Sequence, residues 1–277
     1  MEMGYFDVRP VFGGPATRSF ANSMSTRQGG VAMGSHIEIV IREFHDASLD
    51  PGPEELPLDV VHVWKRRLQA PAVVVDDSYE LLSTEERARA ARYRVVPARS
   101  DFILTRGTLR CLVARYLGKL PKDVWFRYSD CGKPLLKGPF DLRFNVSHTD
   151  GLALIAFARG RQIGVDVERV LLEPDARYLA QRLFSVQEQR SLNLLSDDEA
   201  SRAFFRYWAR KEAYIKARGE GWSTPLHQLD LCVEERQSRA LLQNGPDPAN
   251  PSHWIVRDLP TSSAFAAALA VELRAGN

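Results

Sequence analysis

The order of strand-like and helix-like segments repeats once along the chain, and this repeat constrains the fold more than any other feature of the sequence. In each half, a β-branched or apolar run precedes a helical periodicity, and further strand-like runs follow it. The two halves meet near residue 160, where Gly160 marks a turn. Strands and helices mixed within each half predict an α+β fold made of two similar α/β units.

The individual elements follow from composition and capping signals. The expected strands are residues 37–41, 60–64, 142–146, 152–158, 162–168, 229–233, 254–257 and 265–271. A serine followed three residues later by a glutamate is a capping box, so helices are expected to begin at Ser83 and Ser185. Two longer helices are expected over residues 99–117 and 200–217, the latter stopped by Gly219.

The N-terminal part of the chain differs in composition from the rest. Residues 1–35 are rich in Gly, Ser, Met and Arg, and residues 50–57 contain three prolines. We therefore expect an N-terminal extension and linker over residues 1–57, partly disordered. An N-terminal α/β subdomain over residues 58–160 and a C-terminal one over residues 161–277 would follow.

Charge and cysteine content exclude several classes of protein. The chain has 37 Lys and Arg against 35 Asp and Glu, a net charge of +2, which argues against a general nucleic-acid-binding surface. No run approaches the roughly 18 apolar residues of a membrane span, and no secretory signal is expected. The three cysteines, Cys111, Cys131 and Cys232, are too widely spaced for a zinc site and are expected as reduced thiols of a cytoplasmic protein.

Two carboxylates share one face of an expected strand. Asp166 and Glu168 are two residues apart, and side chains at that spacing point to the same side. Like charges this close repel unless a cation lies between them, and hard oxygen ligands suit Mg²⁺. An edge strand with two solvated acids explains the spacing equally well.

A second candidate group lies on the helix over residues 200–217. Trp208, Glu212 and Lys216 are four residues apart and share a helical face. Glu212 is a candidate metal ligand or general base, and Lys216 a candidate for neutralising phosphate charge. The alternative is a surface Glu–Lys pair beside aromatic side chains of the core.

Two further segments carry polar groups. Ser147 and His148 end an expected strand, where a hydroxyl and an imidazole can meet a phosphate; the alternative is an ordinary strand-to-turn junction. Lys133 follows a glycine in a turn that is not a phosphate-binding P-loop, so it is either an anion-binding side chain or a solvated loop lysine.

Together, these segments resemble the Sfp-type 4′-phosphopantetheinyl transferases. The resemblance extends over residues 59–235 and rests on four motifs in the family's order: GKP at 132–134, FNVSH at 144–148, GVDVE at 164–168 and WARKEAYIK at 208–216. It implies the 4′-phosphopantetheinyl transferase fold, in which two similar α/β subdomains form a pseudo-dimer with the active site at their seam. A monomer is the default for such a chain.

The resemblance also implies roles for the charged residues. Asp166 and Glu168 match the acidic pair that holds Mg²⁺ with the coenzyme A pyrophosphate, and Glu212 matches a third metal ligand that serves as base. Lys216 matches the basic residue near the transferred phosphate, so the implied catalytic residues are Asp166, Glu212 and Lys216. Positions that match coenzyme A contacts are Lys133, Ser147, His148 (at the 3′-phosphate), Arg89 and Lys211. Glu86 falls where some members have lysine, but its capping role explains it better.

The implied reaction moves phosphopantetheine from coenzyme A to a serine of an apo acyl or peptidyl carrier protein, releasing adenosine 3′,5′-bisphosphate. Mg²⁺ would be the cofactor and the carrier protein the partner. One alternative is a non-catalytic relative that binds coenzyme A or a carrier protein, although such a relative is expected to have lost an acid or Lys216. Another is an unrelated Mg²⁺-dependent phosphoryl or nucleotidyl enzyme, which explains the acids but not the other motifs.

Overall fold

The computed structural model describes residues 37–45, 54–172, 175–219, 225–231 and 254–273. All of them belong to one compact unit, Ser35–Asn277. The expected disordered leader over residues 1–35 lies outside the described residues, as do part of the expected linker and Cys232. Cys111 and Cys131 are free thiols, as expected.

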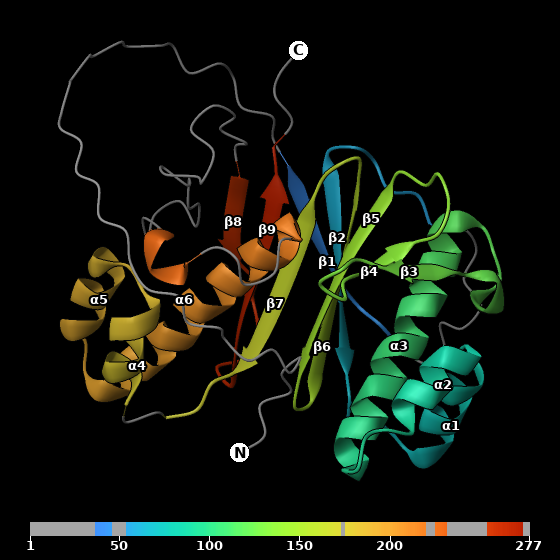
Figure 1. Ribbon diagram of the computed structural model, residues 1–277, viewed down its shortest axis with the longest axis horizontal. Helices are drawn as coiled ribbons and strands as arrows, with labels where there is room; N and C mark the ends of the chain where they lie inside the picture. The colour runs from blue at the N-terminus through green and yellow to red at the C-terminus, as the bar shows by residue number, and fades with distance from the viewer. Residues whose placement is uncertain (1–36, 46–53, 173–174, 220–224, 232–253, 274–277) are drawn as a thin grey trace, which may run out of the picture. The chain divides into compact units, whose positions relative to one another are not determined.

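Mixed strands and helices follow one another through the described residues (Figure 1), which confirms the α+β class. The strands are β1 (Glu38–Glu43), β2 (Val60–Arg67), β3 (Phe126–Tyr128), β4 (Pro134–Leu136), β5 (Leu142–Thr149), β6 (Leu152–Arg159), β7 (Ile163–Arg169), β8 (Trp254–Asp258) and β9 (Phe265–Glu272). The helices are α1 (Ala72–Glu80), α2 (Thr84–Ala90), α3 (Val96–Leu117), α4 (Ala176–Leu183), α5 (Val186–Asn193) and α6 (Asp197–Arg218).

The larger strands form two sheets, with orders β1-β2-β6-β5 and β7-β9-β8, and β3 pairs with β4. In β6, alternate side chains serve different cores, because successive residues of a strand point to opposite faces. Ile155 and Phe157 pack in the cluster that contains Leu112 of α3. Leu154 and Ala156 pack on the other face, in the cluster that contains the second sheet. The apolar run 152–158 is therefore buried on both sides.

In the second sheet, alternate side chains of β9 also pack in two different clusters, one between the sheets and one against a helix. Leu269 and Val271 of β9 share the central cluster with Val167 of β7 and with the first sheet. Ala268 and Ala270 face the other way and pack against α6. Figure 1 shows α3 and α6 on opposite sides of the two sheets. The small alanine side chains of β9 let α6 lie close to the sheet, which places its polar face near β7.

Local signals mark the helix ends as predicted. Ser83 and Ser185 each accept a hydrogen bond from the backbone N–H of a glutamate three residues on, and the glutamate carboxylate accepts one from the serine backbone N–H. The long helices α3 and α6 end at Gly118 and Gly219, with φ of 60° and 72°. Glycine adopts this left-handed conformation without the Cβ clash that other residues incur.

Some expectations differ from the structure. Residues 229–231, expected as part of a strand, follow a 3₁₀ turn at Leu226–Gln228 and are not a strand; the remainder of that expected strand lies outside the described residues. Helix α3 begins at Val96 rather than at residue 99, with Pro97 in its first turn, where no N–H is required. The short elements α1, α4, β3 and β4 were not expected. Within the described residues, none of the helices is long and apolar enough to cross a membrane.

Candidate active site between the two sheets

Helix α6 lies almost in contact with the backbone of β7 at Gly164. A Cβ atom on Gly164 would lie 2.0 Å from the carbonyl oxygen of Ala213 and 2.4 Å from the backbone nitrogen of Ala217. Glycine is therefore required for this approach. Because side chains two residues apart share a strand face, the same geometry turns Asp166 and Glu168 towards α6. The predicted common face of the two acids is thus the face covered by the helix, and they are not solvated edge acids.

Asp166 is the buried centre of the polar group between β7 and α6, with 2% of its surface exposed. Its Oδ1 accepts hydrogen bonds from the Lys216 ammonium at 2.5 Å and from the Ser147 hydroxyl at 2.9 Å. Its Oδ2 is buried and has no hydrogen-bond partner within the described structure. Asp166 Oδ1 therefore already accepts two hydrogen bonds, while Oδ2 accepts none within the described structure.

Glu168 is held by an aromatic side chain of α6. The indole Nε1–H of Trp208 donates to Glu168 Oε1 at 3.0 Å. Burial and the neighbouring Asp166 carboxylate raise the pKa of Glu168 to about 7, against the opposing effects of Lys216 and of the indole hydrogen bond. Glu168 can therefore exchange a proton near neutral pH, and a cation beside it would favour the ionised form.

Glu212 projects from the next turn of α6 after Trp208, as the spacing predicted. Its side chain is buried, and Oε1 has no hydrogen-bond partner in the described part of the chain. Burial raises the pKa of Glu212 to about 7; the Lys216 ammonium opposes this effect and the Asp166 carboxylate adds to it. This carboxylate is suited to take up a proton near neutral pH.

Lys216 supplies the positive charge of this cluster. Burial alone would lower the pKa of its ammonium, but the Asp166, Glu212 and Glu168 carboxylates outweigh that effect and raise the pKa. Besides Asp166, the ammonium also donates to Ser147 Oγ at 3.0 Å. Three carboxylates around one fixed ammonium leave excess negative charge at the site.

His148 and Arg89 lie on the positive side of the site. His148 stands at the end of β5, with its side chain exposed but surrounded by protein atoms that reduce its hydration. This loss of hydration, together with the positive charges of Lys216 and Arg89, lowers the pKa of His148 to about 4. The Arg89 guanidinium packs over the ring of Phe102 at 5.4 Å. The structure therefore places Arg89 and Lys216 close enough to His148 for their positive charges to act on it. An anion would be attracted to these charges.

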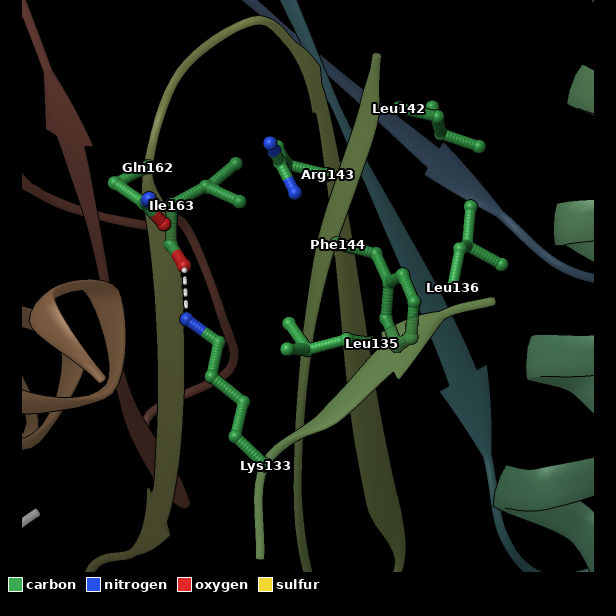
Figure 2. Close-up of a pocket in the computed structure, with 8 residues that line it drawn as sticks. All are labelled: Lys133, Leu135, Leu136, Leu142, Arg143, Phe144, Gln162 and Ile163. Carbon is green, nitrogen blue, oxygen red and sulfur yellow. Dashed lines mark hydrogen bonds between the residues drawn. The ribbon is translucent and has the colours of Figure 1, made fainter. Parts of the chain in front are cut away.

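Lys133, which was expected either to bind an anion or to be solvated, is partly buried and bonds backbone carbonyl groups of α6 and β7. Its ammonium donates to the carbonyl oxygen of Lys216 at 2.6 Å, and to those of Ile163 and Ala217 at 3.4 Å. Figure 2 shows the side chain reaching from the strand after the turn towards Ile163. Burial lowers the pKa of Lys133 to about 8, and the Arg143 charge adds to the effect. All three donors of the ammonium are engaged, so in this arrangement Lys133 anchors the C-terminal end of α6.

The expectation that Lys211 contacts phosphate is corrected by the structure. Its side chain is completely buried and lies 2.8 Å from the Glu188 carboxylate, which is also completely buried. The ammonium also donates to the carbonyl oxygens of Leu226 and Leu229. Lys211 precedes Glu212 by one residue, which on a helix turns the side chain by about 100°, away from the face of Trp208, Glu212 and Lys216.

Lys211→Met is expected to lower the free energy of unfolding by about 3–5 kcal/mol, because it leaves the buried Glu188 carboxylate without its counter-ion. Denaturant unfolding of the wild type, of Lys211→Met, of Glu188→Gln and of the double variant measures this loss. The double variant is expected to lose less than the sum of the two single changes. A Lys211→Met protein that is as stable as the wild type but binds coenzyme A more weakly would instead support the expected contact between Lys211 and phosphate.

Two buried polar residues with long-range contacts, Asn145 and Arg106, were not predicted from the sequence. Asn145 was quoted only as part of a motif, yet its side chain bonds the backbone of β7. Arg106 was not singled out; it pairs with Glu86 at 3.3 Å and donates to the Tyr128 hydroxyl at 2.8 Å. The alternating positions of residues 143–147 were an available signal for Asn145, because they place it on the same face as Ser147.

The donor set fits a divalent cation, although among the described residues no three His, Cys, Asp or Glu side chains are gathered closely enough to hold one as they stand. Two buried carboxylate oxygens, Asp166 Oδ2 and Glu212 Oε1, have no hydrogen-bond partner. Unpartnered buried oxygens are rare in native structures and call for an explanation. All-carboxylate sites with space for water suit Mg²⁺, which usually retains several waters.

Fold and site define an α+β protein with a group of acidic and basic side chains between β7 and α6. Comparison with known proteins agrees. The family model described as the 4′-phosphopantetheinyl transferase superfamily matches residues 162–270. The 4′-phosphopantetheinyl transferase HetI of a Nostoc species is 37% identical over 226 residues, which cover 80% of this chain and 92% of that protein.

The chain belongs to the 4′-phosphopantetheinyl transferase superfamily. The 4′-phosphopantetheinyl transferase Sfp of Bacillus subtilis is 30% identical over 154 residues, covering 56% of this chain and 67% of Sfp. A solved holo-(acyl-carrier-protein) synthase of Bacillus anthracis, in complex with CoA (3′,5′-ADP), aligns with 41% of this chain and 96% of its own. The two share 19% identity with a TM-score of 0.34, a level from which nothing is concluded about this fold.

Proposed function

We propose that this chain transfers the 4′-phosphopantetheine group of coenzyme A to a serine of an apo acyl or peptidyl carrier protein. The observation that carries the proposal is the group of buried Asp166 and Glu212 with partly buried Glu168 and Lys216, beside the basic residues His148 and Arg89. Carboxylates suited to a cation and cations suited to phosphate are what pyrophosphate cleavage requires. The relatives HetI and Sfp, named as transferases of this group, support the same assignment.

Asp166, Glu168 and Glu212 are the residues that would hold Mg²⁺. The unpartnered oxygens of Asp166 and Glu212 support this assignment, as does the raised pKa of Glu168, which burial and the Asp166 charge cause. Bound there, Mg²⁺ would supply Lewis-acid charge stabilisation to the coenzyme A pyrophosphate. The indole N–H of Trp208 holds the Glu168 carboxylate, so this carboxylate would need little reorientation to bind Mg²⁺.

Glu212 serves as the general base in this proposal. The carrier serine oxygen forms a bond to the β-phosphorus of coenzyme A, and the bond from that phosphorus to the oxygen bridging to the adenosine bisphosphate breaks. The serine proton passes to Glu212, directly or through a water, and the bisphosphate leaves with the bridging oxygen. A carboxylate whose pKa is raised to about 7 by burial holds such a proton at neutral pH.

The basic residues bind and balance the phosphate charge. Lys216, fixed by Asp166 at 2.5 Å, faces the charge that develops on the leaving oxygen. His148 and Arg89 form the candidate site for the 3′-phosphate. An anion there would raise the pKa of His148, which loss of hydration and the neighbouring positive charges hold low in the free protein.

The subdomain division is part of the same proposal. Residues 58–160 and 161–277 would be two similar α/β halves forming a pseudo-dimer, each with one sheet covered on its outer face by a long helix. The clusters around α3 and α6, with the central cluster between the sheets, support this division. A chain that supplies both halves of the site is expected to act as a monomer.

Intact mass spectrometry of an apo carrier protein tests the proposed function. Incubation with this protein, coenzyme A and Mg²⁺ is expected to add the mass of one phosphopantetheine, and EDTA is expected to prevent the addition. Acyl, peptidyl and aryl carriers are tested in parallel. No addition to any of them, with coenzyme A still bound, would favour a non-catalytic binding protein instead.

His148→Ala is expected to weaken the binding of coenzyme A about tenfold or more, since it removes a partner of the 3′-phosphate. Dephospho-coenzyme A lacks that phosphate, so its affinity is expected to change by less than about twofold. Isothermal titration of both ligands against both proteins measures the difference. Equal weakening of the two ligands would remove His148 from the 3′-phosphate site.

A further inference from the structure

The two sheets are joined at β5 and β7 by side chains rather than by a backbone ladder. Asn145 of β5 is 5% exposed, and its Oδ1 accepts a hydrogen bond from the backbone N–H of Val165 at 2.9 Å. Ser147 Oγ accepts a hydrogen bond from the backbone N–H of Val167 at 3.3 Å. Two neighbouring backbone donors of β7 are thus satisfied by side chains from the other sheet.

The spacing of these contacts follows from strand geometry. Asn145 and Ser147 are two residues apart and share one face of β5. Val165 and Val167 are also two residues apart, and their N–H groups point to the same edge of β7. A rise of about 3.3 Å per residue is common to both strands, so the two side chains and the two donors match in register. A shift of one residue would break both contacts together.

The residue between the two donors is Asp166. With Val165 and Val167 held on either side, the backbone that carries Asp166 is fixed relative to β5 and the carboxylate is directed at α6. Ser147 also donates to Asp166 Oδ1, which leaves Oδ2 as the unpartnered oxygen. Glu168 follows directly after Val167 and is oriented by the same backbone. The alignment of both acids therefore depends on these side-chain contacts.

We propose that Asn145 is a positioning residue for the acidic site: it touches neither substrate nor cation and acts by fixing β7 through Val165. The proposal rests on the proposed function, because it assigns Asn145 a role in that same site. Lys133 supports the idea that side chains of the first half hold the second, since its ammonium bonds the carbonyl oxygen of Lys216 and that of Ile163, the latter bond drawn in Figure 2.

Asn145→Leu tests the proposal, because leucine has the same branched side-chain skeleton as asparagine but lacks its acceptor. In the metal-free protein, amide hydrogen exchange at Val165 is expected to accelerate at least tenfold more than exchange in β8. In transfer assays, kcat is expected to fall at least tenfold with the KM for the carrier protein changed less than twofold. The Mg²⁺ concentration for half-maximal rate is expected to rise several-fold.

Two further variants separate positioning from stability. Ile255→Ala, in β8 two strands away from β7, creates a cavity at a residue that is 2% exposed and is the matched destabilised control. It is expected to leave kcat and the Mg²⁺ midpoint unchanged. If the leucine variant does not fold, Asn145→Ala replaces it, since water can enter the smaller side chain's space and bond the Val165 N–H.

The outcomes are distinct. Wild-type kcat and Mg²⁺ midpoint in the Asn145 variants, or the same changes in Ile255→Ala, would overturn the positioning role. If the wild type itself transfers nothing to any carrier, the proposed function fails and the positioning role with it. In that event, accelerated amide exchange at Val165 in the Asn145 variants would still show that Asn145 holds β7. The result would then count against the proposed function and not against the contact.

Discussion

Asp166→Ala is expected to lower the rate of phosphopantetheine transfer by roughly 10³-fold or more while the protein remains folded. The change removes the unpartnered Oδ2 and also the acceptor that fixes Lys216 and Ser147. Lys216 keeps the nearby Glu212 and Glu168 charges, so the half-buried ammonium is not left alone. The expected result is a folded protein that has lost both its main cation ligand and the alignment of its lysine.

Single-turnover transfer to a carrier protein, followed by mass spectrometry, measures this loss. Asp141→Ala is the matched control, because Asp141 is an exposed carboxylate that pairs with Arg159 at 3.7 Å, and its removal is expected to leave transfer unchanged. Thermal unfolding establishes that both variants are folded. An Asp166→Ala protein with near wild-type turnover would refute the assignment of the site.

Glu212→Gln is expected to abolish transfer and at the same time to stabilise the metal-free protein at pH 8. Burial raises the pKa of Glu212 from 4.5 to about 7. The folded protein therefore binds a proton that the unfolded chain has already released in this range. Stability from this group is complete below about pH 4.5 and is lost as the pH rises through about 7. Glutamine has no such ionisation, so the variant is expected to be more stable at pH 8 by roughly 2–3 kcal/mol.

Denaturant unfolding of wild type and Glu212→Gln at pH 5 and pH 8 measures the effect. The difference between the two proteins is expected to shrink to under about 1 kcal/mol at pH 5, where the folded wild-type carboxyl is protonated. Addition of Mg²⁺ at pH 8 is expected to stabilise the wild type more than the variant, because a ligand that binds only the folded state raises its stability. If the free energy of unfolding depends on pH equally in the two proteins, ionisation of Glu212 does not destabilise the folded state. Retained transfer would exclude it as the base.

Local patterns were sufficient for most of the long elements and for the acidic core of the candidate site. The capping boxes at Ser83 and Ser185 and the glycine stop at Gly219 lie where they were expected, because the groups that form them are within a few residues of one another. The shared faces of Asp166 with Glu168, and of Glu212 with Lys216, follow from the periods of strand and helix. Short elements such as β3 and α1 were missed because a few residues carry too little periodicity to be recognised.

The partners of these residues were decided by contacts between segments far apart in the chain. Lys211 and Lys216 lie on one helix and carry the same charge, yet one is enclosed with Glu188 and the other faces Asp166. The ammonium of Lys133 bonds the backbone at the end of α6, a contact that its turn alone did not predict. Periodicity states which residues share a face but not which element covers that face. The close approach at Gly164 and the side-chain bonds from Asn145 and Ser147 to β7 form only when the two sheets and α6 pack together, and that packing turns scattered acids and cations into one site.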